Sequence, residues 1–231
     1  MLADWERFGK ARLLDQTIRN RHKRRRAMAI VSHRYKFIFV KTRKTAGTSI
    51  ELYLSGLCGA RDRLTPLVPA ETGHQARNHD GMFNHMSARA LAALEPDCWR
   101  RYFTFCVERN PWDKMLSWHA MKRRSPDHGA RADLTLDDCL AAHDRPLNHP
   151  LYCDGAGAIM VDAVLRYESL DAELARVFDQ IGVPFPGVLP VRAKSHWRTD
   201  RRPYREVYTS AQAECVGALF AREIELHGYE F

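Results

Sequence analysis

The segment KTRKTAGTSIE, residues 41–51, is rich in residue types that bind anions. Lys44 carries a positive charge on a flexible side chain, and Gly47 allows the backbone to come close to a ligand. Hydroxyl groups stand at Thr45, Thr48 and Ser49. On a loop that enters a helix, backbone N–H groups point at the same anion. The segment therefore predicts a phosphate site, against the alternative of an ordinary polar turn between a strand and a helix.

A second group of such residues lies in FCVERNPWDKMLSWH, residues 105–119. Arg109 follows an apolar run, and Ser117 lies further on, inside the next expected helix. A guanidinium fork and a hydroxyl in this arrangement can bind one phosphate. The alternative is that Arg109 only forms a salt bridge with Glu108 or Asp113.

The first segment differs from the phosphate loop of NTPases. That loop has the pattern Gly-x-x-x-x-Gly-Lys-Ser/Thr, in which lysine follows glycine, whereas Lys44 precedes Gly47. A nucleotide kinase is therefore disfavoured, although it would share an α/β architecture.

Strands and helices must position these two segments. Short apolar runs predict buried strands at 35–41 and 103–108. Each strand leads into a helix, at 48–57 and from Pro111 onward. The other predicted elements are helices at 87–94, after Thr135, at 169–182 and at 210–227, and one or two strands within 157–168. This alternation is typical of an α/β fold, a three-layer sandwich with a mainly parallel central sheet.

We expect a single domain over residues 35–231. Residues 1–34 are expected to form a basic helical segment docked on it, because apolar residues recur at roughly helical spacing over 3–24. The run RNRHKRRR at 19–26 is either a solvated helix end or a contact for a polyanion. The irregular stretch 58–84 is expected to contact substrate, since long loops in compact domains tend to be functional.

Composition narrows the classes of function. The chain of 231 residues has a net charge of +8, which favours anionic ligands. No window reaches the ~18 to 20 apolar residues of a membrane span, and charged residues occupy the N-terminus, so we expect no transmembrane segment. Scattered cysteines suit a reducing compartment, so we expect a cytoplasmic protein. The six cysteines form no CxxC pair and have no histidine at zinc-finger spacing, so no metal is expected.

The run from Lys44 to Ser49 resembles the 5'-phosphosulfate loop of the sulfotransferase family that uses 3'-phosphoadenosine 5'-phosphosulfate. The family form is Pro-Lys-Thr/Ser-x-Gly-Thr-Ser/Thr, and Arg43 stands where the family commonly has proline. The resemblance implies that Lys44 balances charge on the leaving phosphate oxygen. It also implies donor binding by Arg43, Lys44, Thr45, Gly47, Thr48 and Ser49.

The run Arg-Asn-Pro-x-Asp-x-x-x-Ser resembles the 3'-phosphate motif of the same family, which implies that Arg109 and Ser117 hold that phosphate. The basic stretch 191–212 is more loosely similar to the family's loop over the 3'-phosphate, with Lys194 and Arg198 as candidates. A solvated basic loop, or one that grips an acidic acceptor, is equally compatible. The similarity spans residues 35–231 and implies a P-loop-like nucleotide-binding sulfotransferase fold.

Transfer of a sulfuryl group to a hydroxyl also needs a base. The candidates His74, His79, His85 and Glu71 lie between the two motifs, and we favour His85 because it directly precedes a predicted helix. The forms KTAGTS and RNPWD are similar to the carbohydrate branch of the family, so we expect a carbohydrate acceptor and no nucleic acid. A lipid-linked or small-molecule acceptor is the alternative. The alternative function is a non-catalytic module that binds polyanions, either glycan or nucleic acid.

Overall fold

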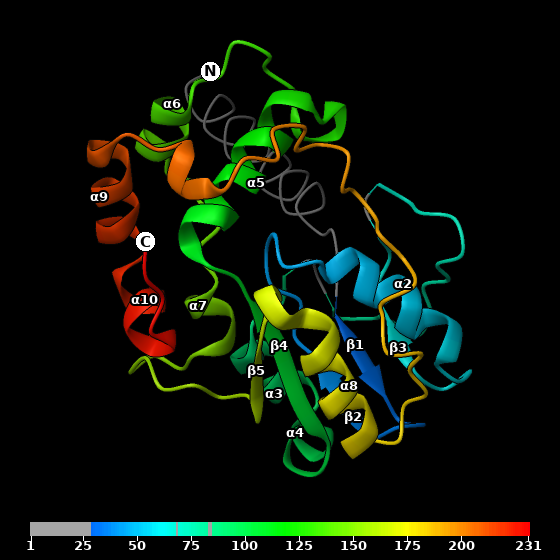
Figure 1. Ribbon diagram of the computed structural model, residues 1–231. Coiled ribbons are helices and arrows are strands. Elements are labelled where there is room, and N and C mark those ends of the chain that lie inside the picture. Colours follow the sequence, from blue (N-terminus) through cyan, green and yellow to red (C-terminus); the bar gives the residue numbers. More distant parts are fainter. Residues whose placement is uncertain (1–28, 68, 83–84) are drawn as a thin grey trace, which may run out of the picture.

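The computed structural model describes residues 29–67, 69–82 and 85–231 (Figure 1). The expected helix over 3–24 and the basic run at 19–26 lie outside these residues.

A five-stranded sheet forms the centre of the fold, in the order β3-β1-β2-β4-β5. The strands are β1 (Ile30–Ser32), β2 (Phe37–Phe39), β3 (Arg63–Leu64), β4 (Phe103–Glu108) and β5 (Ala163–Arg166). The neighbours β2, β4 and β5 run parallel, while β1 is antiparallel to both β2 and β3. The α/β class is thus confirmed, and the sheet is mixed. A short turn joins β1 to β2, and such a turn requires antiparallel pairing.

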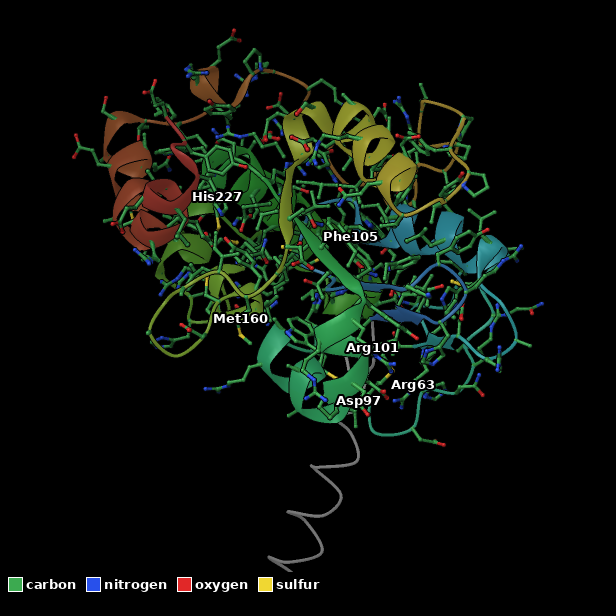
Figure 2. All side chains as sticks on the ribbon, turned by 90° about the horizontal axis from the view of Figure 1, so that it is seen from below. Arg63, Asp97, Arg101, Phe105, Met160 and His227 are labelled. Atoms are coloured by element: carbon green, nitrogen blue, oxygen red, sulfur yellow. The ribbon has the colours of Figure 1, made fainter. Side chains whose placement is uncertain are left out.

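Helices α2 (Gly47–Leu57) and α8 (Leu170–Gln180) cover one face of the sheet (Figure 1). Phe39 and Phe105 pack together on this face with ring centroids 5.1 Å apart, and Phe105 meets Phe178 of α8 at 6.2 Å. All three rings are fully buried. Figure 2, seen from below, shows Phe105 on strand β4.

Helices α3 (Ala88–Leu94), α4 (Pro96–Arg101) and α7 (His149–Tyr152) contribute to a second apolar cluster. Ile38 and Cys106 belong to this cluster, although their neighbours in sequence belong to the first. Successive side chains of a strand point to opposite faces, so the two clusters lie on the two faces of the sheet. Together with α2 and α8, these helices complete the three-layer arrangement.

A third apolar cluster joins helices that lie above the strands and to their left in Figure 1. These helices are α5 (Pro111–Arg124), α6 (Leu136–Ala141), α9 (Ser210–Leu219) and α10 (Ala221–His227). Trp112 of α5 donates a hydrogen bond from Nε1 to the Ala213 carbonyl at 2.9 Å. The cluster therefore ties the helix after the second motif to the end of the chain.

Several element boundaries differ from those expected. The strand expected at 103–108 has those bounds, whereas the strand expected at 35–41 is limited to β2. The helix expected at 210–227 is interrupted at Phe220 and forms α9 and α10. Sequence patterns missed β1. This strand lies within residues 1–34, before the expected start of the domain, and it pairs with β2 of the domain. A strand of three residues is too short to show a period.

Candidate functional site

One cleft of about 1250 Å³ brings the predicted site residues together. Strands β2 and β4 are parallel neighbours, so the loops that follow them leave from the same edge of the sheet. Every residue predicted to bind the donor or to act in catalysis lines the cleft: Arg43, Lys44, Thr45, Gly47, Thr48, Ser49, His85, Arg109, Ser117, Lys194 and Arg198. The expected convergence of the two motifs is therefore present in the structure.

The loop before α2 turns through two left-handed residues. Lys44 has φ 62° and Ala46 has φ 61°, a conformation that residues with a Cβ rarely adopt. Such strain tends to occur at functional sites. Ala46 provides no side-chain cap for α2, and the first helical turn carries no acidic residue. The N–H groups at this helix end thus face the cleft in the arrangement that binds anions.

Gly47 leaves space for the side chain of Lys41. A Cβ atom at position 47 would lie 2.7 Å from Lys41 Cγ and 2.8 Å from Lys41 Cε. Lys41 Nζ donates to Glu51 Oε2 at 2.5 Å and to Thr48 Oγ1 at 3.3 Å. A second lysine, which the motif comparison did not select, is therefore held beneath the loop and also lines the cleft.

The predicted hydroxyl donors take different roles in the loop. The hydroxyl of Thr45 donates to the Thr42 carbonyl at 3.3 Å and lies 2.8 Å from Thr42 Oγ1, so it stabilises the turn itself. Ser49 Oγ accepts from the Ala193 N–H at 3.0 Å, which attaches the basic C-terminal stretch to the loop. Because that oxygen accepts, the hydroxyl hydrogen of Ser49 is still available to an anion.

Arg109 connects the two motifs directly. Its Nη1 donates to the Lys44 carbonyl at 3.1 Å, and its guanidinium lies 4.0 Å from the centroid of the Tyr167 ring. Its Nε donates to Asp113 Oδ2 at 2.7 Å. The salt bridge considered as an alternative is therefore present, and it holds the arginine at the cleft.

The basic stretch 191–212 gives its two candidates different partners at the cleft. Arg198 forms an ion pair with Asp113 and so lies next to the second motif. Lys194 follows Ala193, whose N–H donates to Ser49 Oγ of the first loop, and its charge contributes to lowering the pKa of Lys44 and of Lys41. Both residues line the cleft, and their binding of a 3'-phosphate stays a prediction.

Burial, together with the positive charges of Arg109 and Lys194, lowers the pKa of Lys44 to about 7. A buried ammonium among other cations favours a bound anion, because the anion offsets both the lost hydration and the repulsion. The electrostatics of this position match a site that binds a highly negative ligand.

Among the proposed bases, His85 is placed at the cleft. Its Nδ1 donates to the Lys41 carbonyl at 3.1 Å, which leaves Nε2 as the acceptor of a neutral imidazole. Burial lowers the pKa of His85 to about 3, and nearby Lys41, Arg43 and Lys194 contribute in the same direction. Glu71 lies 3.9 Å from Lys194 in an ion pair. Of the four candidates, His85 alone is among the described residues that line the cleft.

His128 is a cleft residue that sequence patterns missed. Its Nδ1 lies 2.8 Å from Ser125 Oγ. Burial lowers its pKa, and the charges of Lys194 and Lys44 add to this effect. The stretch 125–134 has the composition of a surface connection, so nothing local indicated that the fold returns it to the cleft.

Within the described ranges, no helix is long and apolar enough to cross a membrane. The same residues contain no group of three or more His, Cys, Asp or Glu side chains arranged to hold a metal ion.

The fold and cleft define an α/β protein in which two motifs predicted to bind anions lie at one sheet edge. No family model matches the chain. It is 32% identical over 85 residues to an uncharacterized protein of Archaeoglobus fulgidus, a match that covers 36% of this chain and 70% of that protein. The chain therefore belongs to the same family as this archaeal protein, whose description assigns no activity.

Proposed function

We propose that the protein is a sulfotransferase that moves a sulfuryl group from 3'-phosphoadenosine 5'-phosphosulfate to a hydroxyl of an acceptor. The observation that carries this proposal is the contact between the motifs, in which Arg109 Nη1 donates to the Lys44 carbonyl. This donor carries phosphate at both the 5' and the 3' position of its ribose, so it needs two phosphate-binding motifs side by side. The resemblance of both motifs to the family's two phosphate sites supports this donor.

The residues present fit a 5'-phosphosulfate at the first loop. Gly47 has no Cβ, the N-terminal N–H groups of α2 have no side-chain cap, and Lys44 is half-buried with Arg109 and Lys194 near enough to lower its pKa. Arg109 and Ser117 line the neighbouring part of the cleft, where a 3'-phosphate would bind. Hydrogen bonds from a guanidinium to a phosphate are strong and directional.

The donor supplies the sulfuryl group, whose sulfur bonds to the acceptor oxygen as its bond to the 5'-phosphate oxygen breaks. In the proposed reaction the ammonium of Lys44 balances the negative charge that develops on that phosphate oxygen. Nε2 of His85 takes the proton of the acceptor hydroxyl, because Nδ1–H is held by the Lys41 carbonyl. A bound anion raises the low pKa of His85, since the positive charges around the ring contribute to lowering it.

The acceptor proposed is a carbohydrate hydroxyl. The forms KTAGTS and RNPWD, which are similar to the carbohydrate branch of the family, support this choice. Trp118, Trp197 and Tyr204 also line the cleft and offer rings with an apolar face and a polar edge.

Calorimetric titration with adenosine 3',5'-bisphosphate, beside ADP, tests the proposal. ADP lacks the 3'-phosphate, so we expect the bisphosphate to bind at least about tenfold more tightly, which corresponds to ~1.4 kcal/mol. Equal affinity for both would contradict the role of Arg109 and Ser117. If neither binds while a sulfated glycan does, the alternative of a non-catalytic polyanion-binding module is correct.

A further inference from the structure

Asn148 connects the two phosphate motifs from beneath the cleft. The residue directly precedes α7 and is fully buried. Its Oδ1 accepts from the Arg43 N–H at 2.8 Å, and its Nδ2 donates to the Arg43 carbonyl at 3.1 Å. One side-chain amide thus holds the backbone of Arg43 on both sides.

Holding Arg43 in this way restrains the residue that follows it. The Arg43 carbonyl belongs to the same planar peptide group as the Lys44 N–H. Fixing that plane limits the φ angle of Lys44, which has the left-handed value of 62°. A left-handed lysine persists only where its surroundings enforce it. Asn148 provides such a restraint, because both of its contacts to Arg43 are hydrogen bonds to the backbone.

Asn148 also reaches the residue just before Arg109. Its Nδ2 donates to Glu108 Oε1 at 3.1 Å, and the same oxygen accepts from the Arg109 N–H at 2.9 Å. Lys114 Nζ, at 2.8 Å from Glu108 Oε1, balances the charge of this buried carboxylate. Through Glu108, the backbone of the first motif is linked to the backbone of the second.

We propose that Asn148 is a positioning residue that sets the loop of Lys44 against Arg109, so that both phosphate motifs face one ligand. The identity of that ligand rests on the proposed function, whereas the positioning of the loop does not. Sequence motifs could not show this role, because Asn148 is 105 positions from Arg43 and 40 from Glu108.

The variant Asn148→Ala tests the proposal against Tyr152→Phe as a matched control. Tyr152 is also fully buried and donates to the same carboxylate, to Oε2 of Glu108 at 3.0 Å, but its hydroxyl makes no hydrogen bond to Arg43. We expect Asn148→Ala to weaken binding of adenosine 3',5'-bisphosphate at least about tenfold and Tyr152→Phe to change it less than about twofold. Urea unfolding of both variants measures their loss of stability. Equal losses of affinity in the two variants would overturn the positioning role.

Amide hydrogen exchange provides a readout that needs no ligand. In the wild-type protein we expect the Arg43 amide to exchange only through global unfolding, because its N–H is bound to a buried side chain. We compare the protection factor of this amide in the two variants after correcting each for its global stability. It is expected to be at least about tenfold lower in Asn148→Ala than in Tyr152→Phe. Rapid exchange of Arg43 in the wild type would overturn the proposal even if no variant folds. Failure of the wild type to bind the bisphosphate would instead overturn the proposed function and leave this exchange experiment decisive for Asn148.

Discussion

At the scale of single residues, the surroundings of Lys44 shift its pKa and so determine its charge. Its pKa of about 7 results from burial and from the neighbouring cations Arg109 and Lys194. The protonated form binds an anion, so affinity for adenosine 3',5'-bisphosphate should fall as the pH rises from about 7 to about 9, by up to tenfold per pH unit. Calorimetry across this range measures the effect.

The matched variant for this prediction is Lys44→Arg, which keeps its charge throughout that range. Its affinity should be independent of pH, while Lys44→Ala should bind weakly at every pH. If the affinity of the wild-type protein were equally independent of pH, the protonation of Lys44 would not contribute to ligand binding.

His85 belongs to the same scale, because its role depends on one hydrogen bond. Its Nδ1 is bound to the Lys41 carbonyl, so Nε2 is the nitrogen available as a base. We expect His85→Ala to keep its affinity for the bisphosphate and to lose about 10² to 10⁴ in transfer rate. Transfer of labelled sulfate to a carbohydrate acceptor gives the rate. If Glu71→Gln loses transfer and His85→Ala does not, the base is Glu71.

At the scale of elements, α2 contains two glycines that differ in their surroundings. A methyl group at Gly47 would meet the side chain of Lys41, whose far end is held by Glu51. At Gly56 no such contact lies within 4 Å. We expect Gly47→Ala to destabilise the protein by about 1–3 kcal/mol through overpacking and to weaken ligand binding.

The control Gly56→Ala should be neutral or stabilise α2 by about 0.5–1 kcal/mol, because alanine favours the helix. Urea unfolding measures both changes. Similar effects of the two variants would show that the space beside Lys41 is not what selects glycine at position 47.

At the scale of the whole molecule, the cleft is closed by segments that are distant in sequence. Ala193 is bound to Ser49, and Arg198 is paired with Asp113. A ligand held by all of these segments stabilises the native protein by about 2.7 kcal/mol at a concentration of a hundred times its Kd. For a chain of this size, that predicts a rise in melting temperature of roughly 5–10 °C.

A thermal scan with the bisphosphate, beside one with ADP at the same concentration, checks this prediction. ADP should produce a clearly smaller shift, since the groups at Arg109 and Ser117 would have no phosphate to bind. Identical shifts would indicate that the second motif does not contribute to binding.

The sequence by itself determined the two motifs, the strand at 103–108 and the helix from Pro111, because these depend on neighbouring residues and on the turn chemistry between them. It also selected eleven of the residues that line the cleft. Only the tertiary structure decided that β1 pairs antiparallel with β2, that Lys194 lies by the first loop, and that Asn148 holds Arg43. Contacts between distant segments depend on how the sheet orders its strands and on where buried polar groups find partners, and no local pattern of residues contains either.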